Sequence, residues 1–241
     1  MRASLTATLS RPWLSSRRQR SIALLTVVVL LLAGVHLILR FGPAVAGLVA
    51  APLVAMLLVF LARRAGLTWD ELGLARRSLR RGAVYTLLLV GVVAVGYAVT
   101  LFVPFGKALL TAVSVQLESS GSAWLAMLVL VPLGTVLIEE IAFRGVLLGL
   151  LQRHRGAVVS SLLSSVLFAA WHVLPSLRQE STTVEWTILP PLAFVGLAVA
   201  FTCLAGLVLC EIRRRSGSLL ASAGLHWAVN GLGILLLTQL S

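Results

Sequence analysis

The chain has 241 residues, of which 59% are hydrophobic and only 12% are charged. Soluble domains carry about 25% charged residues, so this composition excludes an ordinary soluble protein and predicts a polytopic membrane protein. The formal net charge of +12 does not indicate a nucleic-acid-binding protein, because the arginines gather in every second loop rather than on one basic face. We expect an all-α fold, a membrane helix bundle with the lipid bilayer as a partner and no nucleic acid.

Seven apolar segments are predicted to cross the bilayer, since a spanning helix needs about 20 mostly apolar residues. A shorter segment, 108–117, cannot cross alone and predicts a re-entrant or surface helix, which would be an eighth helix. No soluble module is evident, so we expect a basic cytoplasmic tail at 1–20 and one transmembrane domain at 21–241. The seven predicted spans are 21–39, 43–62, 82–103, 124–151, 158–173, 189–210 and 218–240.

The arginines predict the orientation of these spans. They concentrate in the N-terminal tail and in alternate loops, so the positive-inside rule predicts a cytoplasmic N-terminus and an external C-terminus. Nineteen arginines against a single lysine, Lys107, indicate a GC-rich bacterial genome. The expected location is therefore the plasma membrane of a bacterium.

Two polar connections carry predictions of their own. In the loop between the second and third spans, Thr68 is predicted to cap a short helix whose first turn carries Asp70 and Glu71. Trp69, in the same loop, is expected at the membrane interface. On the outer side, residues 175–187 are predicted to form a solvated connection.

Two adjacent glutamates, Glu139 and Glu140, interrupt the apolar fourth span of a chain that has only eight acidic residues. An ionised carboxylate near the bilayer centre costs at least about 2.5 kcal/mol, so an intramembrane ionisable residue is a functional-site candidate. Glu140 and Arg144 are four residues apart, and their charges are predicted to pair. Glu139 is rotated by about 100° from Glu140 at 3.6 residues per turn, which leaves its carboxylate free.

Two later spans contribute histidines at matching depth. Counting about 1.5 Å per residue from the cytoplasmic ends, Glu139 lies roughly 18 Å deep, His172 roughly 21 Å and His226 roughly 12 Å. We therefore expect them to meet near mid-membrane, with Phe168 and Asn230 one turn away from the two histidines. A carboxylate with two imidazoles either acts as a general base with polarising partners or binds a divalent metal that activates water.

The other histidines and two tryptophans have simpler interpretations. His36 is predicted to be a core residue with its ring nitrogens hydrogen-bonded, because its span has no other ionisable residue. His154, between two arginines, is predicted to be a solvated loop residue. Trp171 and Trp227 each adjoin one of the site histidines. Two interpretations are open for them, packing in the core and forming the wall of a pocket.

The ordered set of motifs EExxxR, FxxxH and HxxxN, on three late spans, resembles the CAAX protease and bacteriocin-processing family, also called the Abi family, which is related to the type II CAAX prenyl endopeptidases. The resemblance covers residues 124–241, which become the expected catalytic core. It implies an intramembrane endopeptidase that hydrolyses a prenylated or membrane-associated peptide. It further implies that Glu139 activates water and Asn230 holds the oxyanion. His172 and His226 would assist as polarising or metal-ligating groups, while Glu140, Arg144 and Phe168 support them.

The metal requirement stays open at this point, because the family includes proteins described as metalloproteases and as glutamate proteases. A divalent metal such as zinc would be held by Glu139, His172 and His226. The chain lacks HExxH, the usual helical zinc motif, and asparagine is not a usual zinc ligand. Two other classes of function are also open: an ion- or proton-coupled transporter, and a non-catalytic membrane scaffold or immunity protein.

Overall fold

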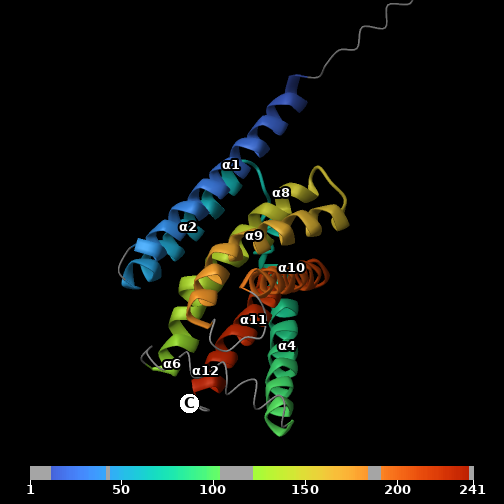
Figure 1. The fold of residues 1–241 in the computed structure, drawn as a ribbon. Coiled ribbons are helices and arrows are strands. Elements are labelled where there is room, and N and C mark those ends of the chain that lie inside the picture. Colours follow the sequence, from blue (N-terminus) through green and yellow to red (C-terminus); the bar gives the residue numbers. More distant parts are fainter. Residues whose placement is uncertain (1–11, 42–43, 104–121, 184–190, 239–241) are drawn as a thin grey trace, which may run out of the picture.

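The structure, a computed structural model, describes residues 12–41, 44–103, 122–183 and 191–238. Its elements in these ranges are all helices, without a strand, which confirms the all-α prediction (Figure 1). Six helices are long and apolar enough to cross a membrane, and a shorter apolar stretch covers Ile22–Ile38. The predicted count of about seven is therefore confirmed, and the chain is an integral multi-pass membrane protein. The predicted helix at 108–117 lies outside the described residues.

Five of the seven long helices are continuous or nearly so, and the fourth and seventh are composites of α- and π-helical turns. The fourth comprises α6 (Ala123–Leu125), η1 (Ala126–Val136), α7 (Leu137–Glu139), η2 (Glu140–Leu147) and α8 (Leu148–Gln152). The seventh comprises α11 (Leu219–Trp227), η3 (Ala228–Leu232) and α12 (Gly233–Thr238). The others are α1 (Pro12–Phe41), α2 (Ala44–Arg64), α4 (Arg76–Phe102), α9 (Ala157–Thr183) and α10 (Pro191–Ser216), with the short α3 (Trp69–Leu72) before α4.

The prediction of a loop that begins at Pro175 is wrong, because α9 continues through this proline to Thr183. Proline lacks an N–H group and therefore removes a single backbone hydrogen bond, the one to the carbonyl of Trp171. Ending the helix there would instead leave several backbone groups unpaired, each at a cost of several kcal/mol in an apolar surrounding. Continuation of α9 is the less costly arrangement.

The π-helical turns of the fourth helix have a local explanation at Pro132. In a π-helix each N–H bonds to the carbonyl five residues earlier, as the N–H of Leu137 does to Pro132. Pro132 cannot donate the equivalent bond to the carbonyl of Met127, because proline has no N–H. The indole Nε1 of Trp227 donates to the Met127 carbonyl at 2.8 Å instead. Trp227 therefore ties the seventh helix to the fourth by satisfying a backbone acceptor.

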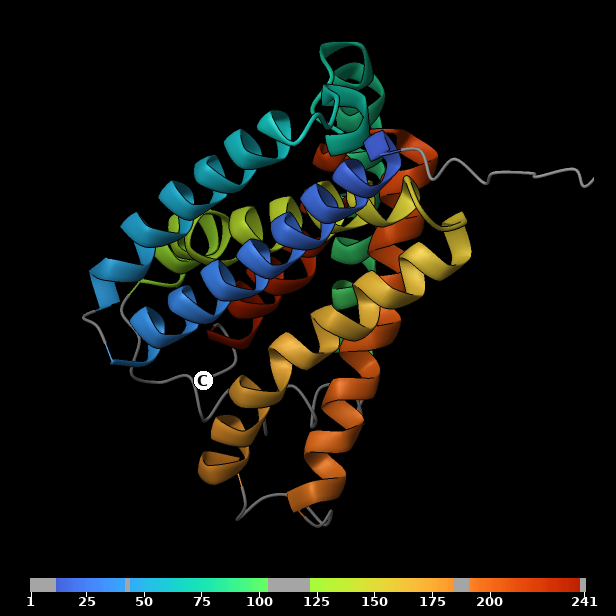
Figure 2. The same ribbon diagram turned by 90° about the horizontal axis from the view of Figure 1, so that it is seen from above.

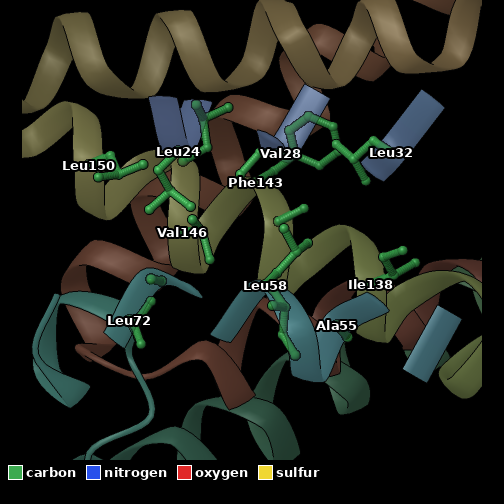
Figure 3. Packing of buried hydrophobic residues seen from close by; sticks show 14 of the residues in the cluster. Leu24, Val28, Leu32, Ala55, Leu58, Leu72, Ile138, Phe143, Val146 and Leu150 are labelled. Carbon is green, nitrogen blue, oxygen red and sulfur yellow. The ribbon is translucent and has the colours of Figure 1, made fainter. Parts of the chain in front are cut away.

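The fourth helix packs against most of the bundle. It contacts α1, α2, α9, α10 and the seventh helix, and it runs alongside α1 and α2 in the view from above (Figure 2). A cluster of buried hydrophobic side chains forms the core, and its members come mainly from α1, α2 and the fourth helix, as Figure 3 shows. They include Leu24, Val28, Leu32, Leu58, Ile138, Phe143, Val146 and Leu150.

The loop between α2 and α4 is held tightly by arginines. Thr68 and Glu71 form the predicted N-terminal cap of α3, with each side chain bonded to the backbone of the other. Arg153 binds the Glu71 carboxylate at 2.6 and 2.7 Å, and this hydrogen bonding raises the pKa of Arg153. Arg213 donates to the carbonyls of Asp70 and Glu71 at 3.0 Å. The loop is therefore fixed both to the residue that follows α8 and to α10.

Small residues let α4 approach the seventh helix closely, and the two helices lie side by side (Figure 1). Thr86 donates to the Leu220 carbonyl at 2.9 Å, and Tyr97 donates to the Val229 carbonyl at 2.7 Å. A Cβ atom added at Gly224 would overlap the Thr86 side chain. Close approach through small residues is the usual way in which membrane helices associate.

We expect Gly224→Ala to destabilise the protein by about 1–3 kcal/mol, the usual cost of overpacking a close contact. Gly91→Ala is the matched control, because it lies on α4 with open space around the added Cβ. The measurement is thermal unfolding in detergent micelles, followed by tryptophan fluorescence. Equal melting temperatures for the two variants would contradict the predicted close contact.

Candidate active site

Glu140 and Arg144 form a fully buried ion pair within η2. Arg144 Nη1 lies 3.0 Å from Glu140 Oε1, and the two side chains are 0% and 1% exposed. The Arg144 guanidinium also lies over the Phe168 ring, 3.9 Å from its centroid. Their four-residue spacing predicts this pair, and the ring of α9 adds a cation–π contact to it.

His226, on α11, touches both glutamates. Its Nδ1 lies 2.9 Å from Glu140 Oε1, and its Nε2 lies 3.7 Å from Glu139 Oε2. Ionised carboxylates only accept hydrogen bonds, so Nδ1 carries the proton and donates it to Glu140. In the neutral imidazole this leaves Nε2 with its lone pair toward Glu139.

His172, on α9, reaches the same point from another helix. Its Nδ1 lies 2.8 Å from the Phe168 carbonyl, an acceptor, so Nδ1 is again the protonated nitrogen. Its Nε2 lies 3.9 Å from Glu139 Oε2. The two histidines therefore direct the same nitrogen toward one carboxylate oxygen, and three helices meet there.

The Glu139 carboxylate is buried and its two oxygens differ in their partners. Oε1 accepts a hydrogen bond of 2.9 Å from the indole Nε1 of Trp171. Oε2 has no hydrogen-bond partner among the described residues, although it faces both imidazoles. A buried acceptor without a partner is costly in free energy. Oε2 of Glu140 also has no partner among the described residues, but Oε2 of Glu139 is the one that faces both imidazole Nε2 atoms.

Phe168 is the centre of an aromatic cluster beneath the histidines. Its ring lies 4.5 Å from that of His172 and 5.8 Å from that of His226, in edge-to-face geometry. Phe143 adds a third contact at 5.2 Å. Edge-to-face packing fixes ring orientations, so Phe168 holds both imidazoles as well as the guanidinium of Arg144.

Asn230 lies on η3, one turn beyond His226, and is partly exposed. Among the described residues its side chain makes no hydrogen bond to the glutamates or histidines. The structure therefore brings Glu139, Glu140, Arg144, His172 and His226 together but leaves Asn230 outside their direct contacts. Its role in holding an oxyanion stays a prediction.

A metal site receives no geometric support from the described part of the chain, in which no group of three His, Cys, Asp or Glu side chains could hold a metal ion. The donor types of Glu139, His172 and His226 suit zinc. The Nε2 atoms of His226 and His172 lie 3.7 and 3.9 Å from Glu139 Oε2, which is too far for a hydrogen bond. The predicted metal stays a prediction, and no step below depends on it.

These features define a membrane protein with a buried carboxylate and two imidazoles poised together inside a helical bundle. Residues 120–232 match the family model described as type II CAAX prenyl endopeptidase Rce1-like, which confirms the resemblance predicted from the motifs over this segment. No curated protein and no solved structure gives a significant match. The matched family is a protease family, which supports a protease with a peptide or protein substrate.

Two site neighbours were not predicted as such. His36, on α1, packs edge-on against Trp171 with 4.0 Å between ring centroids. Ser222 lies beside Glu140, and its hydroxyl donates to the Leu219 carbonyl at 3.1 Å. The signal for Ser222 was available, since it lies four residues before His226 and so on the same face of α11. No signal in the sequence linked His36 to α9.

We expect Arg144→Met to destabilise the protein by about 3–5 kcal/mol, because it leaves the Glu140 charge buried without its partner. The matched control is Arg77→Met, which removes an exposed ion pair with Asp70 and should cost about 0–1 kcal/mol. Denaturant unfolding in detergent micelles gives both values. Equal losses in the two variants would contradict the burial of the Glu140 pair.

Proposed function

We propose that the chain is an intramembrane endopeptidase that hydrolyses a peptide bond in a prenylated or membrane-associated peptide or protein. The observation that carries the proposal is the Oε2 atom of Glu139, which is buried, has no hydrogen-bond partner among the described residues and faces two imidazole nitrogens. A carboxylate in this position accepts a proton from water. The match of residues 120–232 to a prenyl endopeptidase family supports the substrate class.

In the proposed reaction, Glu139 removes a proton from a water molecule as the water oxygen bonds to the carbonyl carbon of the substrate. The carbonyl oxygen becomes an oxyanion, and the tetrahedral intermediate then breaks its C–N bond. Glu139 returns the proton to the leaving amine, so that the enzyme is restored. The products are a carboxylate and an amine.

The imidazoles orient the water and stabilise the oxyanion. In its doubly protonated form, an imidazole donates from Nε2 to the developing negative charge. Glu140 fixes the orientation of the His226 ring through its bond to Nδ1 at 2.9 Å. Asn230 has a side-chain amide without a partner among the described residues, and we assign it the remaining oxyanion contact that the family resemblance implies.

Glu139→Gln is expected to reduce cleavage by at least about 100-fold, the lower range of a positioned general base. The substrates are a quenched fluorescent prenyl-peptide and a panel of membrane peptides, with purified protein in nanodiscs. Glu211→Gln is the matched control, because this glutamate is paired with Arg214 and Arg215 on the surface end of α10. Equal turnover by Glu139→Gln and the wild type would overturn the proposed role of Glu139.

Turnover is expected to survive incubation with a strong chelator, since the proposed reaction uses no metal. The measurement compares initial rates before chelation, after chelation and after addition of zinc. Loss of activity that zinc restores would contradict the metal-free reaction. It would instead assign Glu139, His172 and His226 as metal ligands.

A further inference from the structure

We propose that His36 and Trp171 form a positioning pair that holds the Glu139 carboxylate in its reactive orientation. This inference rests on the proposed function, because it concerns the same carboxylate. It assigns a role in the site to α1, a helix that lies outside the matched residues 120–232.

The two oxygens of Glu139 are held differently. A carboxylate that turns by half a revolution exchanges Oε1 and Oε2, and an unrestrained carboxylate samples intermediate orientations. The indole N–H of Trp171 binds Oε1 at 2.9 Å, and hydrogen bonds to ionised acceptors are among the stronger ones. This bond fixes the plane of the carboxylate and directs Oε2 toward His172 and His226.

The Trp171 indole is held in turn by neighbouring aromatic rings. Trp171 is itself only partly buried, so its orientation depends on the rings around it. His36 packs against it at 4.0 Å between centroids with planes inclined by 80°, whereas Phe143 lies farther away, at 6.4 Å. Edge-to-face contacts restrict ring rotation. His36 is therefore the nearest aromatic restraint on the donor to Glu139.

His36 lies on a well-packed part of α1. It follows Val35, which is 1% exposed and belongs to the buried cluster together with Leu32. Their packing against the bundle fixes this part of α1, so the His36 ring is supported by a rigid helix. Two contacts thus connect α1 to the carboxylate. The His36 ring packs against the Trp171 ring, and the Trp171 N–H donates to Glu139 Oε1.

A double-mutant cycle in nanodiscs tests the pair. Trp171→Phe removes the N–H donor and should lower kcat by about 10- to 100-fold with KM within about 2-fold, as expected for misplacement of a reacting group. His36→Ala should lower kcat by about 10-fold in the wild type but by less than about 2-fold in Trp171→Phe, because residues that act through one another are not additive. His36→Phe keeps an aromatic ring and should restore most of the rate. An equal effect of His36→Ala in both backgrounds would overturn the proposal.

A second measurement does not depend on turnover. The protein has six tryptophans, and 5-fluorotryptophan labelling gives each a fluorine NMR signal. The signal that is missing from the spectrum of Trp171→Phe belongs to Trp171. That signal should shift in His36→Ala and in Glu139→Gln but not in His154→Ala, a histidine control in the exposed loop before α9. An unmoved signal in His36→Ala would overturn the pair. Shifted signals in a protein without any turnover would support the pair and count against the proposed function.

Discussion

A guanidinium and a carboxylate held together in an apolar interior are the constraint on which the site depends. The desolvation of two buried charges exceeds their attraction unless further contacts satisfy them. Here Glu140 also binds His226, and the face of Phe168 covers Arg144. These added contacts come from α11 and α9. The guanidinium nitrogens of Arg144 have no hydrogen-bond partner among the described residues, so the Phe168 ring and the Glu140 charge are their main compensation. The buried charge of the fourth helix therefore recruits the two helices that supply the histidines, so that stability and site assembly have the same origin.

Adjacent glutamates take different roles because their surroundings differ. Glu140 is surrounded by Arg144, His226 and Ser222, and its charge is compensated. Among the described residues Glu139 has a single hydrogen-bond donor, Trp171, and its other oxygen faces the imidazoles. The change from α7 to η2 falls between them, and π-turns occur frequently at functional sites. One carboxylate is thereby structural and the other is available for chemistry.

Much of this arrangement was predictable from local spacing. The features that were not predicted depend on contacts between residues far apart in the sequence or on the surroundings of the helices. Span lengths predicted about seven helices, four-residue spacing predicted the Glu140–Arg144 pair, and depth predicted the meeting of Glu139 with the histidines. The π-turns near Pro132 were not predicted, because they depend on a backbone carbonyl to which a distant residue, Trp227, donates. The extension of α9 through Pro175 was not predicted, because it depends on the cost of unpaired backbone groups in an apolar surrounding. The contact of His36 with Trp171 depends on how α1 packs, which periodicity does not encode.

The arginines of the predicted cytoplasmic side have a structural role in addition to their topological one. The positive-inside rule accounts for their presence in these loops, but it does not require the bonds that Arg153 and Arg213 make to the α3 loop. That loop packs where the fourth helix has glycines: a Cβ atom added at Gly149 would lie 2.9 Å from the Glu71 carbonyl. The same helix that carries the glutamates is thus anchored at its end by the loop and at its middle by the ion pair. With both points fixed, the direction of Glu139 is set by side-chain contacts alone, which is why its neighbouring rings matter.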